Sequence, residues 1–259
     1  MNNENCRQHF YVLAYEMGAE RTPVPTWASS IDNPLKLEAS STVQTQHIDI
    51  PSVPACFQVM DILTAQECAD LVRTSESLGY SEDASVSLPR SVRKNENLVW
   101  IIDQITHNII WKRVEKAFVH LGDTYDGKKA VGLNRRFRFY KYSKGDFFKP
   151  HTDGAWPGSG IVDQQLIANV SPDRYSRMTF LLLLSDDFQG GETAFYVNKE
   201  DASKPAKRTE EVKIEEIRTP LGAALCFPHG AHPLHALHGS REIRSGVKYI
   251  IRTDVLFEL

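Results

Sequence analysis

Two segments in the first half of the chain carry apolar residues at helical spacing. In the first, Thr64 is placed as an N-cap with Glu67 three residues later, and Gly79 follows the last apolar position. In the second, residues 105–121 place apolar side chains on one side of a helix. Extended chain is expected before the first helix at residues 48–60, and a short apolar stretch lies between the two helices at 98–102.

The apolar pattern changes to the period of a β-strand after residue 130. Residues 132–142 (GLNRRFRFYKY) alternate and are rich in aromatic side chains, whereas residues 179–184 (TFLLLL) form a continuous apolar run. A continuous run is typical of a strand that is covered on both faces. Further short strands are expected at residues 192–197, 211–217, 223–227 and 248–257. Two helices followed by several short strands predict a mainly β protein, with flanking helices packed on a β-sandwich or jelly-roll barrel.

The pattern also predicts how the chain is organised. Residues 1–47 have no clear period and contain scattered Pro, Ser, Thr and Asn, so we expect irregular chain there, apart from a short strand or helix at 11–17. Residues 48–259 are expected to form a single domain, with helical support and a substrate-side region in 48–130 and the barrel in 131–259. Polar segments at 81–89 and 199–211 are expected to be loops.

The composition is that of an average globular protein, with 41% apolar and 24% charged residues. A formal net charge of −3 provides no basic field, so no nucleic-acid partner is expected. No stretch reaches the about 20 apolar residues of a membrane span, and the N-terminus lacks the basic start and apolar run of a secretory signal. The four cysteines lie far apart, which favours reduced thiols. We therefore expect a cytoplasmic protein without a membrane segment.

His151 and Asp153 are the first candidates for chemistry. Residues two apart on extended chain point to the same side, so an imidazole and a carboxylate would meet there. These groups are two of the three ligands of a 2-His-1-carboxylate site, which binds Fe(II) and leaves positions open for substrate and oxygen. The third ligand would come from a later series spaced three residues apart: His229, His232, His235 and His238.

Lys248 and Arg252 are candidates for binding a carboxylate near such a metal. A straight extended chain would carry Lys248 about 33 Å away from His238, so it reaches the same pocket only if the chain turns back. Ser245 and Gly246 supply a turn at that place. Arg252 follows on the same strand face and is the alternative. Taken alone, Lys248 is more simply interpreted as an exposed strand lysine.

Together these residues resemble the iron(II)/2-oxoglutarate-dependent dioxygenases, in their prolyl 4-hydroxylase-like branch. The resemblance covers about residues 50–257, and the C-terminal half matches best in order and spacing. It implies a double-stranded β-helix, which is a jelly-roll barrel of the cupin type. The motifs that carry it are YSKGDFFKPHTD at 142–153, TFLLLLS at 179–185, GGET at 190–193, PLG at 220–222 and HGSREIRSGVK at 238–248.

The resemblance implies the residues that bind iron and co-substrate. Iron would be bound by His151, Asp153 and His238, and His235 is an alternative to His238 whose spacing fits less well. Lys248 would bind the distal carboxylate of 2-oxoglutarate, with Arg252 as its rival. Tyr142 and Thr179 match positions that help to hold this carboxylate. The implied cofactors are Fe(II), 2-oxoglutarate as co-substrate and O2, with ascorbate as a reductant.

The resemblance implies hydroxylation of an unactivated C–H bond, with release of succinate and CO2. The substrate would be peptidyl, as in prolyl hydroxylation, or derived from an amino acid, and Arg93, Asn95 and Trp156 are its candidate contacts. An oxygenase of the same class that acts on a free small molecule is an alternative. A non-catalytic jelly-roll module that binds a metal or ligand, and a zinc hydrolase with the same three ligands, are alternatives from other classes.

Overall fold

The computed structural model describes residues 7–39, 45–84, 88–119, 121, 125–202, 204 and 212–259. Its helices are α2 (Ala65–Leu78), α3 (Gln104–Val114) and a 3-10 helix, η1 (Glu115–Phe118). Its strands are β1 (Phe10–Met17), β2 (Pro23–Ser29), β3 (Gln46–Asp49), β4 (Phe57–Met60), β5 (Arg93–Lys94), β6 (Glu96–Ile101), β7 (Ala130–Leu133), β8 (Arg136–Tyr142), β9 (Phe147–His151), β10 (Gly160–Val162), β11 (Gln165–Ile167), β12 (Arg174–Leu183), β13 (Phe188–Gly190), β14 (Thr193–Asn198), β15 (Val212–Ile217), β16 (Ala224–Pro228), β17 (His238–Ser240), β18 (Ile243–Gly246) and β19 (Lys248–Glu258).

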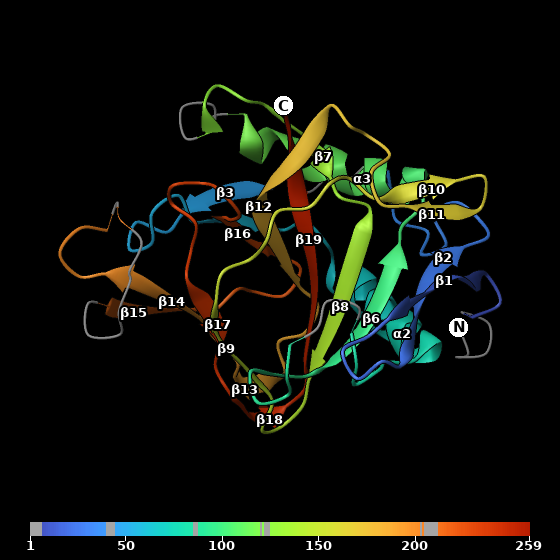
Figure 1. The fold of residues 1–259 in the computed structure, drawn as a ribbon, viewed down its shortest axis with the longest axis horizontal. Helices are drawn as coiled ribbons and strands as arrows, with labels where there is room; N and C mark the ends of the chain where they lie inside the picture. The colour runs from blue at the N-terminus through green and yellow to red at the C-terminus, as the bar shows by residue number, and fades with distance from the viewer. Residues whose placement is uncertain are drawn as a thin grey trace.

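Most of the strands belong to two sheets. The large sheet has the strand order β1-β2-β6-β8-β19-β12-β16-β4-β3, and β7 also pairs with β19. The small sheet has the order β15-β14-β17-β9-β5. In Figure 1 the small sheet lies to the left of β19, β8 and β6, so β9 and β17 face the centre of the large sheet. The mainly β architecture predicted from the sequence is therefore confirmed.

Alternation along β8 explains why the large sheet has two different faces. Phe137 and Phe139 join a cluster of buried apolar residues on one face, whereas Tyr140 and Tyr142 join a second cluster on the other. The second cluster includes Phe195 of the small sheet, so it lies between the two sheets. The even-numbered residues of β8 therefore point into the space between the sheets, where a site can form.

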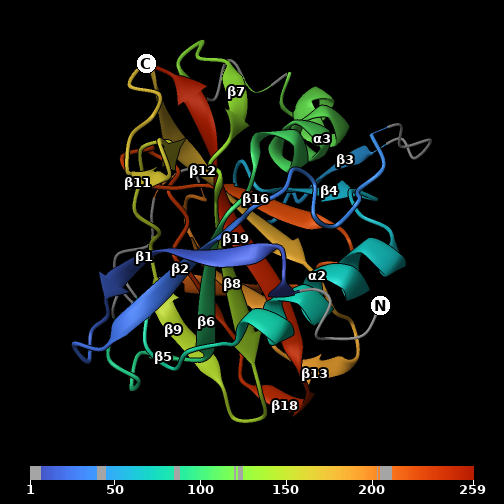
Figure 2. The same ribbon diagram turned by 90° about the vertical axis from the view of Figure 1, so that its right-hand side faces the viewer.

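The two helices contribute to the cluster on the opposite face. Leu71 of α2 and Ile110 of α3 belong to the same buried cluster as Phe137, and Figure 2 shows both helices on one side of the large sheet. The predicted capping box of α2 is present: Glu67 N donates to the Thr64 hydroxyl, and Thr64 N donates to the Glu67 carboxylate. Helix α3 is shorter than predicted, because its last turn tightens into η1.

The short strand or helix expected at residues 11–17 is strand β1, but the expectation of irregular chain after it is wrong for residues 23–29, which form β2. Strands β1 and β2 form an antiparallel hairpin, and β2 extends the large sheet by pairing in parallel with β6 at Thr26–Ala28. Pro23 and Pro25 suggested a break in regular structure. Both lie before the stretch that pairs with β6, so their missing N–H groups cost no hydrogen bond on that side.

Other predictions about segments have mixed outcomes. The division of the domain at residue 130 stays a prediction. Strands β4 and β6, which come before this residue, belong to the same large sheet as strands that come after it. Much of the expected loops at 81–89 and 199–211 lies outside the described residues, at 85–87, 203 and 205–211. Within the described part of the chain, no helix is both long and apolar enough to cross a membrane.

Candidate metal centre and its cavity

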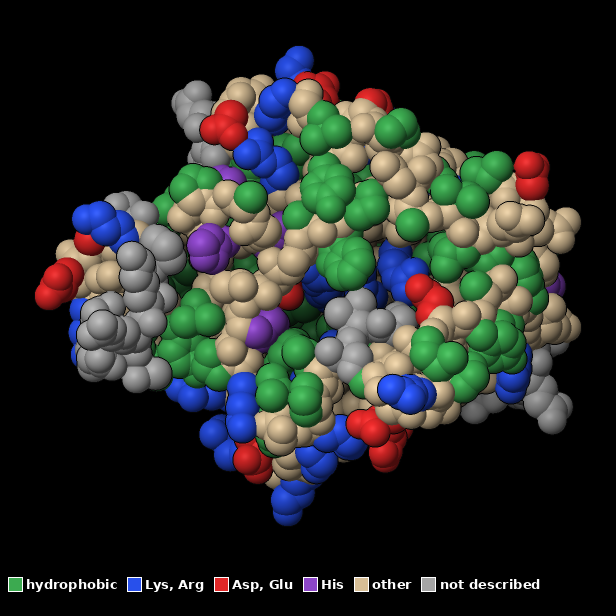
Figure 3. Space-filling view, in the orientation of Figure 1, with side chains coloured by type: hydrophobic (Ala, Val, Ile, Leu, Met, Phe, Trp, Pro, Cys, Tyr) green, Lys and Arg blue, Asp and Glu red, His purple; other side chains and the backbone are tan. Residues whose placement is uncertain are grey.

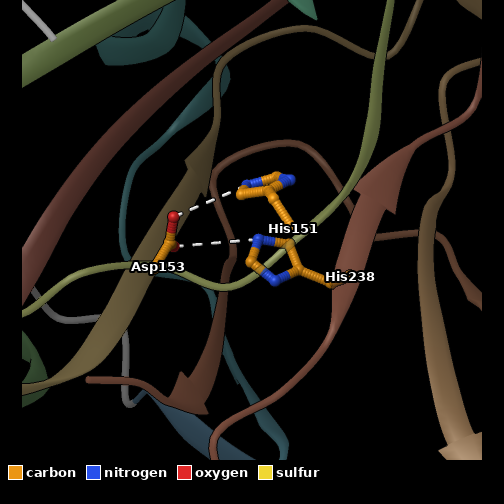
Figure 4. A group of neighbouring side chains, drawn as sticks. All are labelled: His151, Asp153 and His238. Carbon is orange, nitrogen blue, oxygen red and sulfur yellow. Dashed lines mark ion pairs between the residues drawn. The ribbon is translucent and has the colours of Figure 1, made fainter. Parts of the chain in front are cut away.

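Two neighbouring strands of the small sheet bring the candidate ligands together. His151 ends β9, His238 begins β17, and the two residues are direct partners in the antiparallel ladder. Asp153 follows two residues after β9, with its carboxylate 3.6 Å from His151 Nε2 and 3.7 Å from His238 Nε2. Figure 4 shows both imidazoles turned toward this carboxylate. The three ligand atoms lie within 4.8 Å of one another, as a single bound metal ion requires.

Backbone carbonyl groups fix the orientation of both imidazoles. His151 Nδ1 lies 2.9 Å from the Lys149 carbonyl oxygen, and His238 Nδ1 lies 3.0 Å from that of Ala236. Since a carbonyl oxygen only accepts, each ring carries its proton on Nδ1 and directs the lone pair of Nε2 toward Asp153. Burial lowers the pKa of His238 to about 4, which keeps this ring neutral. The donor set fits a 2-His-1-carboxylate iron site.

A buried chain of hydrogen bonds holds the Asp153 carboxylate from behind. The Thr179 hydroxyl donates to Asp153 Oδ2 at 2.7 Å, and its oxygen lies 3.0 Å from His229 Nδ1. His229 Nε2 in turn lies 3.0 Å from the Ser176 hydroxyl, which accepts from the Trp156 backbone N–H at 2.7 Å. Burial lowers the pKa of His229, so it takes part as a neutral ring that donates from Nδ1 and accepts at Nε2.

Arginine also contributes to the charge around this carboxylate. Burial alone would raise the pKa of Asp153, but the Arg252 guanidinium beside it holds this pKa well below its usual range. Arg252 Nε lies 3.5 Å from Asp153 Oδ2. The carboxylate is therefore ionised and available as a metal ligand.

Lys248 is a buried cation at the other end of the same space. It opens β19 opposite Tyr142 of β8, and its side chain is 2% exposed. Its ammonium donates to the Gly191 carbonyl oxygen at 2.5 Å and to the Ser240 hydroxyl at 3.4 Å. No carboxylate among the described residues forms an ion pair with it. Burial lowers the pKa of Lys248 to about 8, so the environment is suited to an anion that would stabilise the charge.

One cavity of about 260 Å³ joins the triad to Lys248. In Figure 3 a hollow near the centre of the molecule has a histidine, an acidic side chain and Lys or Arg side chains on its floor, with hydrophobic side chains around it. Predicted residues that line the cavity include all three candidate ligands, the co-substrate candidates and two substrate candidates: His151, Asp153, His238, Tyr142, Thr179, Lys248, Arg252, Arg93 and Trp156.

Two predicted candidates lie elsewhere. Asn95 is buried next to Asn97, to which its amide donates at 3.3 Å, and it lines a separate depression rather than the cavity. His235 also lines a different depression, and its Nδ1 lies 2.9 Å from the His232 carbonyl oxygen. The structure thus groups His238, and not His235, with His151 and Asp153.

Sequence reasoning missed two functional candidates in this region. Arg138 lines the cavity, and the period-two alternation of β8 with Tyr140 and Tyr142 was a signal for its position. His229 belonged to the histidine series but lacked any signal for its contact with Thr179, because that contact joins residues 50 apart in the chain.

The sequence matches no protein-family model and no curated protein. Among solved structures, it is similar to a Trichoplax adhaerens prolyl hydroxylase in complex with a peptide fragment of the hypoxia inducible factor oxygen degradation domain. The identity is 14%, the match covers 79% of this chain and 84% of that one, and the TM-score is 0.52. The chain has the fold of a prolyl hydroxylase. The resemblance to this group that the sequence predicted is therefore confirmed for the fold.

Two other solved structures align less closely. A viral collagen prolyl hydroxylase from Paramecium Bursaria Chlorella virus-1, in complex with 2OG, is 15% identical, with 82% of this chain and 100% of that chain covered and a TM-score of 0.49. A Pseudomonas putida prolyl-4-hydroxylase is 12% identical, with 79% and 92% covered and a TM-score of 0.49.

Proposed function

We propose that this protein is an Fe(II)- and 2-oxoglutarate-dependent dioxygenase that hydroxylates a C–H bond of a peptidyl or amino-acid-derived substrate. The observation that carries the proposal is a single cavity with two distinct sites. One site is the triad of His151, Asp153 and His238, and the other is the buried ammonium of Lys248. A keto-acid that chelates a metal and carries a second carboxylate matches both sites at once.

The surroundings of the two cations support Lys248 over Arg252 as the co-substrate anchor. Arg252 already lies 3.0 Å from one oxygen of Asp254 and 3.5 Å from Asp153. The hydrogen-bond partners of Lys248 in the described structure are only a carbonyl oxygen and a hydroxyl. A buried charge without a counter-ion is costly, and the distal carboxylate of 2-oxoglutarate would supply that counter-ion.

The contacts of Tyr142 and Thr179 support different roles for these two residues. Tyr142 is the strand partner of Lys248, and the ammonium lies 5.6 Å from the centre of its ring, so we place Tyr142 beside the distal carboxylate. The Thr179 hydroxyl is bonded to Asp153 and approaches His229. We therefore assign Thr179 to positioning the metal ligand rather than to holding the distal carboxylate.

When bound, Fe(II), 2-oxoglutarate and O2 supply the oxidative decarboxylation to succinate and CO2 and the oxygen atom that enters the substrate C–H bond. The protein supplies binding and orientation. His151, Asp153 and His238 would hold the metal, and Lys248 would bind the distal carboxylate of the keto-acid. Apolar walls such as Phe227 and Ile250 limit the access of water to the cavity. The use of ascorbate as a reductant stays a prediction. It is tested by measuring turnover with and without added ascorbate.

The similar Trichoplax adhaerens enzyme is in complex with a peptide, which favours a peptide substrate here as well. The zinc-hydrolase alternative leaves the uncompensated ammonium of Lys248 unexplained. A non-catalytic module would bind 2-oxoglutarate without turning it over, and that outcome is measurable.

The test is succinate formation from 2-oxoglutarate by protein that has been loaded with Fe(II) anaerobically and then exposed to O2. Wild-type protein should form succinate slowly without a substrate, and His151→Ala should abolish this turnover. The Lys248→Ala variant should show measurable turnover only at high 2-oxoglutarate concentration, because the substitution removes the anchor but leaves the metal ligands in place. The matched control is His235→Ala, which removes a histidine from the same segment but outside the cavity.

The outcomes distinguish the dioxygenase from the non-catalytic binding module. Succinate formation that depends on His151 but not on His235 supports the dioxygenase. Calorimetric binding of 2-oxoglutarate without succinate would instead support the binding module. If neither binding nor turnover occurs in the iron-loaded wild type, the proposal is wrong.

A further inference from the structure

Two arginines lie side by side at the end of the cavity that is remote from Lys248. Arg138 of β8 and Arg252 of β19 are direct partners across the two strands, and both line the cavity. Arg252 lies four residues beyond Lys248 on the same strand, so about 13 Å of chain separates the two positions. Both arginine side chains are buried, with 4% and 6% of their surface exposed. Neither arginine is a metal ligand or the proposed anchor of 2-oxoglutarate, although Arg252 lies beside the ligand Asp153.

The carboxylates near these arginines are too few for both guanidinium groups. Asp254 serves both, at 3.4 Å from Arg138 Nη1 and 3.0 Å from Arg252 Nη2. The second neighbour of Arg252 is Asp153, which is a ligand in the proposed metal site. The buried Nη2 of Arg138 has no hydrogen-bond acceptor among the described residues, and the Trp156 ring lies 5.1 Å from the guanidinium carbon. One carboxylate is therefore shared between two cations.

Charge balance in the filled cavity points in the same direction. A divalent metal with Asp153 leaves one positive charge, and doubly charged 2-oxoglutarate together with Lys248 neutralises it. The two arginines and the single carboxylate of Asp254 then leave one positive charge. His229 does not change this count, because burial lowers its pKa and keeps the ring neutral. A further cation, Arg93, lines the cavity from β5. A buried net positive charge is costly unless an anion binds there.

We propose that the Arg138–Arg252 end of the cavity binds a carboxylate group of the substrate. The inference rests on the dioxygenase function proposed above and specifies its substrate class as an acid. Planar guanidinium groups recognise carboxylates through paired hydrogen bonds, and Arg138 has a free Nη2 donor for this purpose. Arg252 also contacts the proposed ligand Asp153, so the bound carboxylate lies close to the metal. The hydroxylated carbon is therefore near the carboxylate in the substrate.

The carboxylate has two sources, and paired compounds separate them. The first set pairs each of the twenty free L-amino acids with its α-amide. It tests whether the site binds the α-carboxylate of a free amino acid. The second pair is N-acetyl-aspartic acid α-amide and N-acetyl-asparagine α-amide, which tests a side-chain carboxylate of a peptide. Each compound is titrated calorimetrically into wild-type protein that carries Mn(II) in place of Fe(II) and saturating 2-oxoglutarate, so no turnover occurs.

We expect at least one acid to bind at least tenfold more tightly than its matched amide. Tenfold corresponds to about 1.4 kcal/mol. Arg138→Gln should reduce this preference to less than threefold, whereas Arg138→Lys, which keeps the charge, should retain part of it. The matched control Arg244→Gln removes an exposed arginine from β18 and should keep the preference of the wild type.

The comparison of acids with amides needs only wild-type protein, so a variant that fails to fold does not remove the test. If every acid binds no better than its amide in both sets, the inference is overturned. An Arg138→Gln variant that folds and keeps the full preference would also overturn it. If 2-oxoglutarate itself does not bind to the Mn(II)-loaded protein, the proposed function fails first, and this result is seen before any substrate is added.

Discussion

Replacing Lys248 by methionine should stabilise the protein and at the same time weaken the binding of 2-oxoglutarate. The ammonium is buried without an ion-pair partner among the described residues, and its pKa falls from 10.5 to about 8 because of this burial. A shift of this size corresponds to about 3 kcal/mol of folding free energy spent on burying the charge at neutral pH. Methionine fills a similar space without a charge.

The net effect is smaller than this cost, because the variant also loses a hydrogen bond. The bond from Lys248 to the Gly191 carbonyl oxygen contributes about 1 kcal/mol, so we expect a gain of about 1–2 kcal/mol at pH 7. Between pH 8 and 10.5 the unfolded state binds more protons at this lysine than the folded state. The stability of the wild type should therefore rise across this window, and Lys248→Met should lack that rise.

Urea unfolding with and without 2-oxoglutarate on Mn(II)-loaded protein measures both effects. At 100 times its Kd, 2-oxoglutarate should stabilise the wild type by about 2.7 kcal/mol. The variant should gain far less at the same concentration, because a charge-assisted hydrogen bond of about 1.5–3 kcal/mol is missing. The control Lys144→Met changes an exposed lysine in the turn between β8 and β9 and should behave like the wild type. A Lys248→Met protein that is less stable without ligand, or equally stabilised by it, would refute the reasoning.

Three further predictions concern the support of the metal centre. Thr179→Val should weaken Mn(II) binding by about tenfold to a hundredfold in calorimetric titrations because Asp153 loses its donor, and Thr179→Ser should restore it. His229 is buried with a pKa below its usual 6.5, so the unfolded state takes up its proton first and stability should fall as the pH drops below about 6.5. Urea unfolding across this range should show a flatter dependence for His229→Asn, and an unchanged slope would contradict this. A Cβ at Gly239 would lie 2.6 Å from the Phe148 carbonyl oxygen, so Gly239→Ala should push β17 away from β9 and weaken both folding and Mn(II) binding. Mn(II) affinity equal to that of the wild type would show that the strands tolerate the methyl group.

Local features of the sequence were sufficient to predict much of the framework. The Thr64–Glu67 capping box depends on residues three apart, and it is present at the start of α2. The alternation of β8 depends on the pleat of a single strand, and its two faces are buried in two different clusters. The spacing of His151 and Asp153 likewise needed only one extended segment. Where a short stretch of chain sets the geometry, the sequence predicted it.

The pairing of β2 with β6 could not be predicted in this way. The hairpin of β1 and β2 adds to the large sheet through a parallel pairing of β2 with β6, about 70 residues further along the chain. Pairing across such a separation depends on the position of β6 in the assembled sheet. The prolines in β2 were interpreted as a sign of irregular chain, but only the assembled sheet decides which side of the strand needs hydrogen-bond donors.

The sequence by itself determined that a His-x-Asp pair, a later histidine and a later lysine are present, and that the chain is rich in short strands. Only the tertiary structure decided that His238 rather than His235 meets the pair, because the ladder between β9 and β17 places it opposite His151. It also decided that Thr179 bonds to Asp153, and that Arg138 stands beside Arg252 with one carboxylate between them. These contacts join distant segments, and their distances depend on the registers of several strands, which no local pattern encodes.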